Sequence, residues 1–244
     1  MALNLEKGTP QNTVVSDAGP QNAAIYNGGN LGRTLTTETQ PAFPIYHRRL
    51  ANPAPLGLWS FASTTLILSL INVQARGVTV PNIVVGMALG VGGLCQLLAG
   101  MWEFAAGNTF GATAFSSYGG FWLSFACIYL PNLGILDAYA GDAASQVPNA
   151  VGIYLMSWFI VTFLLFLGTF RASVALSAVF FFLFITFILL GAGNFTGEAT
   201  VIKAGGAFGI ITALVAYYVG AAGLYSPDTS YFILPIGDLP KLRD

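Results

Sequence analysis

The chain has 244 residues, of which 55% are hydrophobic and only 8% are charged, and its formal net charge is −1. Soluble domains carry about 25% charged residues, so the composition excludes an ordinary soluble domain. The near-zero net charge gives no reason to expect a nucleic-acid partner. Only seven Asp, Glu, Lys or Arg side chains occur between positions 55 and 225. This pattern is typical of a protein that crosses a membrane several times.

The first part of the chain, residues 1–50, is rich in Asn, Gln, Thr, Gly and Pro and has few large apolar residues. Such a composition buries too little apolar surface to offset the entropy of ordering. We therefore predict a disordered N-terminal tail. It lacks the basic, apolar and small-residue pattern of a removable signal peptide.

Six apolar stretches follow, each approaching or reaching the roughly 20 residues that span a bilayer as a helix. They lie at about 53–73, 82–105, 109–130, 150–168, 172–191 and 204–224. The sequence thus predicts an all-α membrane protein. Residues 51–225 would form six transmembrane helices, arranged as three helical hairpins around a pore within the protomer, and residues 226–244 a C-terminal tail.

Six spans place both termini on one side of the membrane, and the basic residues indicate which side. Seven Lys and Arg fall on the side of the termini and two, Arg76 and Lys203, on the other. Cytoplasmic loops carry the excess of Lys and Arg, so we predict that both termini are cytoplasmic. Asn194-Phe195-Thr196 is then a glycosylation sequon on the outer side, close to the membrane.

The three helices that start from the cytoplasm each have a plausible N-cap: Asn52, Asn108 and Ser173. Nine or ten residues further along a helix is about 14–15 Å, or half of a roughly 30 Å hydrocarbon core. The residues at that depth are Phe61, Tyr118 and Leu183. Our hypothesis is that these three side chains form a hydrophobic constriction in a central pore. Counting alone leaves open that they are ordinary core or lipid-facing residues.

Uncharged polar side chains surround these positions. Hydroxyl groups in the first and third spans either line the pore or pack helix against helix, as small residues do in membranes; they are Ser63, Thr64, Thr113 and Ser117. Gln96 lies deep in the second span and either bonds neighbouring helices or faces the pore. Glu103 is the one charged residue that falls inside a span, near its end.

Catalytic chemistry finds little support in this composition. The chain has one His and two Cys, and both Cys lie in apolar segments. Neither a nucleophile–base pair nor a set of metal ligands can be assembled from them. We therefore expect no enzyme activity, no bound metal and no cofactor.

Residues 52–58 (NPAPLGL) resemble the signature of the acetate uptake transporter family, which includes bacterial succinate–acetate permeases and fungal acetate transporters also called ammonia-transport-outward proteins. A second match is the run 107–122 (GNTFGATAFSSYGGFW), and shorter matches are Gly193-Asn194 and 234–237 (LPIG). The resemblance covers roughly residues 51–238. The long N-terminal tail is similar to that of the fungal branch.

The resemblance implies a six-helix protomer with its own pore, assembled as a homo-hexamer that passes acetate and related short carboxylates such as succinate. It implies a constriction of Phe, Tyr and Leu, which corresponds to Phe61, Tyr118 and Leu183. Asn52, Gln96 and Glu103 also fall on family motif positions. The departures are the tail and the longer loop around residues 137–149, so nothing about regulation follows from the family.

Three functions remain open from the sequence. The first is a plasma-membrane channel or permease for acetate and similar monocarboxylates. The second is a proton-coupled symporter that uses Glu103. The third, of another class, is a membrane sensor whose tail carries the output and whose transport is vestigial. Ammonium export is disfavoured because the spans contain no His or paired acidic groups to recruit the cation.

Overall fold

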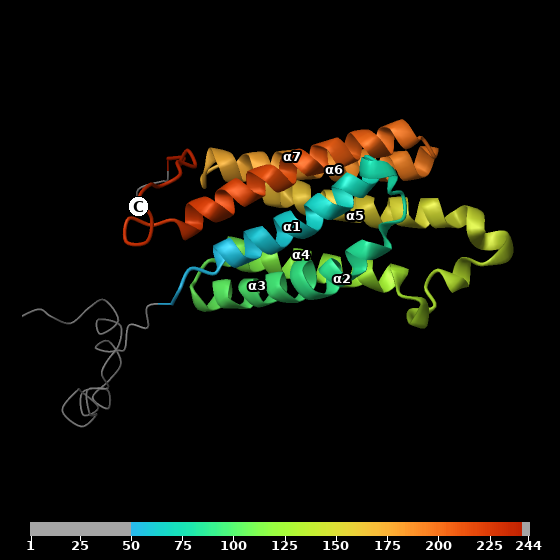
Figure 1. Ribbon diagram of the computed structural model, residues 1–244, viewed down its shortest axis with the longest axis horizontal. Helices are drawn as coiled ribbons and strands as arrows, with labels where there is room; N and C mark the ends of the chain where they lie inside the picture. The colour runs from blue at the N-terminus through green and yellow to red at the C-terminus, as the bar shows by residue number, and fades with distance from the viewer. Residues whose placement is uncertain (1–49, 241–244) are drawn as a thin grey trace, which may run out of the picture. The chain divides into compact units, whose positions relative to one another are not determined.

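The computed structural model describes residues 50–240, so the predicted disorder of residues 1–50 falls almost wholly outside the described residues. These residues form helices and connecting loops (Figure 1). The helices are α1 (Ala54–Asn72), α2 (Val84–Leu89), α3 (Gln96–Ala105), α4 (Thr109–Tyr129), α5 (Val147–Leu167), α6 (Val174–Thr196) and α7 (Ala199–Leu224). A π-helical turn, Gly90–Cys95, joins α2 to α3.

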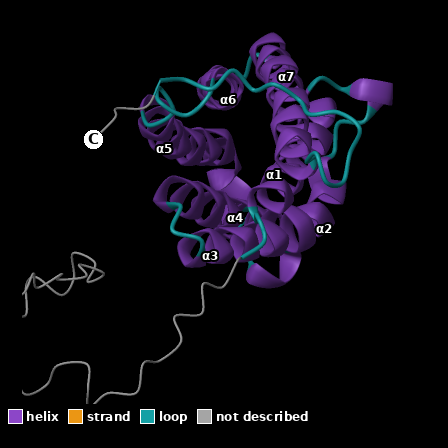
Figure 2. Cartoon of the chain, turned by 90° about the vertical axis from the view of Figure 1, so that its left-hand side faces the viewer, coloured by secondary structure: helices purple, strands orange, loops and turns teal. Residues whose placement is uncertain are grey.

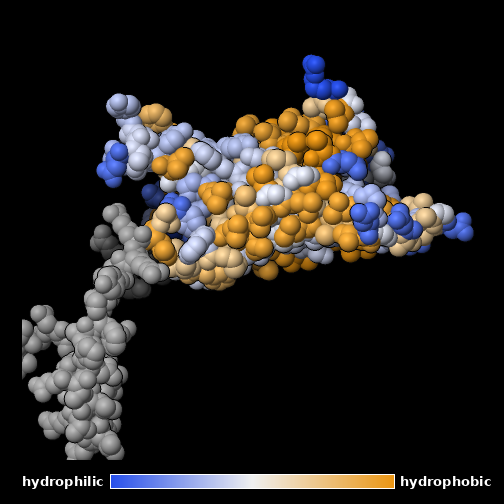
Figure 3. All heavy atoms as spheres, turned by 60° about the horizontal axis from the view of Figure 1, so that its bottom comes forward, coloured by the Kyte–Doolittle hydropathy of each residue, from blue (hydrophilic) through white to orange (hydrophobic). Residues whose placement is uncertain are grey.

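The predicted all-α membrane fold is confirmed. Five helical segments are long and apolar enough to cross a bilayer: Ala54–Asn72, Pro81–Ala106, Gly141–Leu167, Val174–Thr196 and Ala199–Leu224. α4 has 21 residues, but Ser, Thr and Gly make it less apolar, and much of it is buried against other helices. Figure 3 shows an outer surface that is apolar along its middle and hydrophilic at both ends, as a membrane-spanning bundle requires.

Two helix starts agree with the sequence and one differs. Asn108 caps α4 by accepting a hydrogen bond from the Gly111 N–H (3.1 Å), and Ser173 caps α6 by accepting one from Leu176 (3.2 Å). At α1 the N-cap position is Pro53, and the Asn52 side chain accepts from Ala54 N–H one step earlier (3.1 Å). Because a proline at the cap leaves no side-chain acceptor, the preceding Asn supplies it.

Most of the extensive contacts join helices that are adjacent along the chain, and the contact between α1 and α7 joins the first helix to the last. α1 packs most extensively against α7, α7 against α6, α6 against α5, and α3 against α4, while α1 also contacts the π-helical turn and α3. Figure 2 views the bundle end-on. α4 and α5 meet through aromatic side chains, with Phe121 stacked on Tyr154 at a centroid distance of 5.7 Å. The three-hairpin arrangement is therefore not confirmed and stays a prediction.

The end of α6 carries the sequon. α6 continues through Thr196, so Asn194 lies in its last turn, and its amide Nδ2 donates to the Leu190 carbonyl (2.8 Å). That nitrogen is the atom to which a glycan would be attached. We expect the Asn194→Gln variant to show the same electrophoretic mobility as the parent protein, with or without glycosidase treatment. A glycosidase-sensitive shift lost in the variant would contradict this placement.

Candidate functional site

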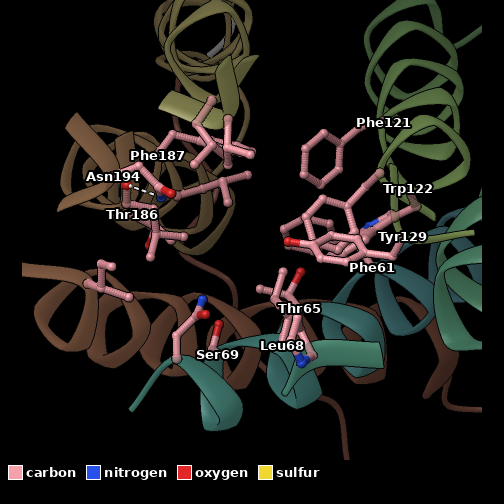
Figure 4. Close-up of a pocket in the computed structure, with 18 residues that line it drawn as sticks. Phe61, Thr65, Leu68, Ser69, Phe121, Trp122, Tyr129, Thr186, Phe187 and Asn194 are labelled. Atoms are coloured by element: carbon pink, nitrogen blue, oxygen red, sulfur yellow. Dashed lines mark hydrogen bonds between the residues drawn. The ribbon is translucent and has the colours of Figure 1, made fainter. Parts of the chain in front are cut away.

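Two cavities lie inside the bundle and share part of their walls. The larger, of about 580 Å³, lies toward the end where α4 and α6 begin, and its lining includes Asn52, Asn108 and Ser173. The smaller, of about 190 Å³, lies toward the opposite end, near Asn72 and Asn194 (Figure 4). Phe61 and Leu183 line both cavities. A path from one end of the bundle to the other therefore passes these two side chains.

Tyr118 completes the boundary from α4. Its ring lies 5.5 Å from that of Phe61, centroid to centroid, and its side chain also lines the larger cavity. The Tyr118 hydroxyl donates to Thr162 Oγ1 on α5 (2.9 Å), which holds the ring in place. Phe61, Tyr118 and Leu183 are all at most 5% exposed. The structure thus brings together the three side chains that the sequence placed at one depth.

Polar groups of the larger cavity come mainly from α3 and the start of α4. The Asn108 Nδ2 donates to Glu103 Oε2 (2.8 Å), while the Asn108 Oδ1 caps α4. The second carboxylate oxygen, Glu103 Oε1, has no hydrogen-bond partner among the described residues. Asn52 borders the same cavity and donates to the Gly223 carbonyl on α7 (3.3 Å). Glu103 and Asn108 therefore brace the α3–α4 corner and leave one acceptor free.

Gln96 borders the larger cavity at the first turn of α3. It is 0% exposed, and neither its amide nitrogen nor its amide oxygen has a hydrogen-bond partner among residues 50–240. The interpretation that it bonds neighbouring helices is therefore not supported. Buried amides are nearly always hydrogen-bonded, because an unpaired one costs roughly 1–3 kcal/mol. An unpaired amide in a cavity wall is suited to a polar ligand.

The smaller cavity has two free polar groups of its own. Trp122 Nε1 and Thr65 Oγ1 are buried in its lining and have no hydrogen-bond partner among the described residues. Both side chains appear beside Phe61 in Figure 4. The sequence did not identify Trp122 as a functional residue, because a large aromatic ring inside a membrane span suggests only a packing role. The signal that could have pointed to it is an indole donor in mid-span within the second family motif.

Four hydroxyl residues were candidates for lining the pore: Ser63, Thr64, Thr113 and Ser117. Within the described part of the chain, none of them belongs to the lining of either cavity. Thr64 donates to the Ser60 carbonyl within α1, and Tyr217 on α7 donates to Ser63 (2.7 Å). Thr113 is exposed and bonds within α4, and Ser117 is half-buried there. The pore-lining role of Ser63, Thr64, Thr113 and Ser117 stays a prediction. Their placement outside the lining of these two cavities favours the alternative that they pack helix against helix.

The described part of the C-terminal tail packs on the bundle and forms part of the larger cavity's wall. The N–H groups of Val174 and Ala175, at the start of α6, donate to the carbonyls of Gly237 (2.8 Å) and Ile236 (3.0 Å). Tyr218 on α7 donates to the Pro235 carbonyl (2.6 Å). Figure 2 shows this segment as a loop crossing the ends of α6 and α7. The first backbone N–H groups of α6, which have no partner within the helix, therefore donate to the C-terminal segment.

The charges around the larger cavity are all acidic. Its lining contains Glu103 and Asp238, and no Lys, Arg or His from residues 50–240 lines either cavity. Groups of three or more side chains able to hold a metal ion do not occur within the described residues. The arrangement offers a small neutral polar molecule a hydrogen-bonding wall, and it offers an anion no compensating positive side chain.

Comparisons with known proteins agree with this architecture. The model of the GPR1/FUN34/yaaH family matches residues 32–241. The chain is 47% identical over 234 residues to ammonia transport outward protein 2 of Saccharomyces cerevisiae, covering 92% of this chain and 82% of that protein. It is 49% identical over 203 residues to acetate permease A of Emericella nidulans, covering 79% and 68%.

A bacterial relative extends the match to a solved structure. The succinate-acetate/proton symporter SatP of Escherichia coli K12 is 40% identical over 193 residues, which cover 78% of this chain and 97% of that protein. The structure of the bacterial acetate channel SatP superposes with a TM-score of 0.68 at 40% identity, covering 78% of this chain and all of that one. The resemblance predicted from NPAPLGL and the 107–122 run is confirmed: the chain belongs to the GPR1/FUN34/yaaH family.

Proposed function

We propose that this multi-pass membrane protein is a plasma-membrane channel or permease for acetate and related short-chain carboxylates. The observation that carries the proposal is the pair of cavities separated at Phe61 and Leu183. Relatives named as an acetate permease and as an acetate channel support the substrate class. We assign the protein no catalytic activity.

In this mechanism the substrate passes from one cavity to the other between Phe61, Tyr118 and Leu183. The three side chains offer mainly apolar surface, since the Tyr118 hydroxyl is bonded to Thr162. A full charge at bilayer depth costs at least about 2.5–3.5 kcal/mol even on lenient insertion scales. The constriction therefore favours the undissociated acid, and uptake rises as the external pH falls toward the carboxyl pKa of roughly 4–5.

The test is uptake of labelled acetate into liposomes that contain only the purified protein, measured with an imposed pH gradient and after its collapse. Protein-free liposomes give the background from acid that crosses the lipid. We expect protein-dependent flux that relaxes to the distribution set by the two pH values. Folded protein without any flux above background would overturn the proposed function.

A proton-coupled symporter is the second candidate, and one observation favours it. Glu103 is 2% exposed, borders the larger cavity and keeps one oxygen unbonded among the described residues. A carboxylate in that position has the geometry of a proton carrier. This candidate requires accumulation beyond the distribution that the pH gradient alone sets.

Topology and assembly form part of the same proposal. We propose that both termini are cytoplasmic, which places the larger cavity on the cytoplasmic side, and that six copies associate as a homo-hexamer. The excess of basic residues on the side of the termini supports the orientation. A bundle whose own cavities run past Phe61 needs no pore between subunits. Labelling of an engineered cysteine in the tail from one side of sealed vesicles tests the orientation.

A further inference from the structure

The unpaired amide of Gln96 is the starting point. Its nitrogen and its oxygen are both without a hydrogen-bond partner among the described residues, although the side chain is fully buried and borders the larger cavity. The π-helical turn Gly90–Cys95 immediately precedes it. Such turns are rare in proteins, and those that do occur are often found at functional sites. The extra residue in the turn rotates the side chains that follow it around the helix axis. Here the rotation applies to the first residue of α3.

Among residues 50–240, no positive side chain that would bind an anion lines the larger cavity beside Gln96. The titratable residues that line the larger cavity are Glu103 on α3, Tyr118 on α4, Tyr225 after α7, and Asp238 in the C-terminal segment. Two of these are acids and two are phenols, and Tyr118 already donates its proton to Thr162. A carboxylate anion here would meet acidic groups without a counter-ion, which makes the neutral form of the ligand the better match.

We propose that Gln96 recognises the undissociated carboxyl group through a pair of hydrogen bonds. In this pair the Nε2–H donates to the carbonyl oxygen of the acid, and the Oε1 accepts the acid's O–H. A carboxylate offers only acceptors, so it would leave Oε1 facing a negative oxygen. Gln96 is then the specificity-determining residue for the protonation state of the substrate. This inference rests on the proposed function.

The Gln96 side chain borders the larger cavity but is fully buried, so binding requires its amide to turn toward the ligand. The terminal torsion of Gln is broad and roughly two-fold, so the amide plane can turn toward the cavity from its buried position. Glu103 lies seven residues further along α3 and therefore on the same helical face, two turns away. Because Asn108 holds one oxygen of Glu103, that carboxyl group is fixed at the α3–α4 corner, and Gln96 is the polar group nearer the constriction on this face.

Acetamide provides the test, because it is neutral at every working pH and presents the same donor and acceptor pair as acetic acid. In liposomes, acetamide is expected to inhibit protein-dependent uptake of labelled acetate with equal potency at pH 5 and pH 7. The potency of total unlabelled acetate should fall on the order of 50-fold between these values, as its neutral fraction falls. Acetamide without effect on a protein that transports acetate would overturn the inference.

Two variants locate the effect. Gln96→Leu is expected to lower acetate flux about tenfold and to abolish inhibition by acetamide. Gln96→Glu should retain flux at pH 5, where a protonated Glu can pair with the acid, and lose it at pH 7 beyond the fall seen in the parent protein. Gln146→Leu, at an exposed position before α5, is the matched control and should behave as the parent protein.

The outcomes separate this inference from the proposed function. Parent protein without acetate flux removes the function itself. Parent protein that transports acetate, with Gln96→Leu still inhibited by acetamide, removes only the role of Gln96. The acetamide measurement on the parent protein needs no variant, so a folding defect in a Gln96 variant leaves the test intact.

Discussion

Replacing Leu183 by Ala is expected to admit carboxylates larger than acetate. Leu183 lines both cavities and is 3% exposed, so removing its side-chain carbons widens the passage where the cavities meet. A difference of one methylene in an apolar pocket changes discrimination by about 10- to 200-fold. We expect the ratio of lactate or butyrate flux to acetate flux to rise at least about tenfold, and Phe61→Ala to act in the same direction.

The control for this change is Leu214→Ala. Leu214 lies on α7, is 56% exposed and lines neither of the two cavities described above. The Leu214→Ala variant should keep the size discrimination of the parent protein. Each ratio is measured in liposomes with labelled acids at one pH, so that differences in expression cancel. Unchanged discrimination in both Leu183→Ala and Phe61→Ala would exclude these side chains as the constriction.

Replacing Glu103 by Gln is expected to leave the steady-state distribution of acetate unchanged under an imposed pH gradient. If the undissociated acid is the species that passes, the gradient alone sets the distribution at about tenfold per pH unit, well above the acid's pKa. The proton then travels on the substrate and needs no carboxylate relay. The measurement is total internal acetate at steady state, with the internal pH held one unit above the external pH.

A symporter predicts the opposite result. Accumulation by the parent protein above the level set by the gradient, lost in Glu103→Gln, would establish coupling through this residue. The side-chain oxygen of a Gln at position 103 can still accept the hydrogen bond from Asn108 Nδ2, while Asn108 Oδ1 continues to cap α4. The substitution therefore removes the charge while the α3–α4 corner keeps its hydrogen bond. The exposed acid Asp142, changed to Asn, is the matched control.

The membrane fold and the central residues were accessible from the sequence for simple physical reasons. Apolar runs of bilayer length must become helices, since no water is present to satisfy the backbone. The caps Asn108 and Ser173 begin α4 and α6 at the expected residues. Counting a fixed rise per residue from those starts placed Tyr118 and Leu183 at one depth. Local rules determine these features.

Orientation around each helix axis was not accessible in the same way. The sequence left open whether the hydroxyls of Ser63 and Thr113 line a pore or pack helix against helix, and in the structure they bond Tyr217 and the α4 backbone. Counting residues along a membrane helix gives the depth of a side chain, but it does not say whether that side chain faces a cavity or a neighbouring helix. That orientation depends on how the helices pack. Trp122 also lines the smaller cavity, although the sequence suggested only a packing role for its ring.

The sequence by itself determined that this chain is a helical membrane protein, where α1 and α4 begin and end to within one residue, and which family motifs it carries. Only the tertiary structure decided which side chains face the cavities, that the C-terminal segment closes over the start of α6, and that the amide of Gln96 is buried unpaired. The first set depends on transfer from water to lipid and on hydrogen bonds between near neighbours in the chain. The second depends on contacts between helices far apart in sequence, where a rotation of one residue exchanges a ligand-facing side chain for a packing one.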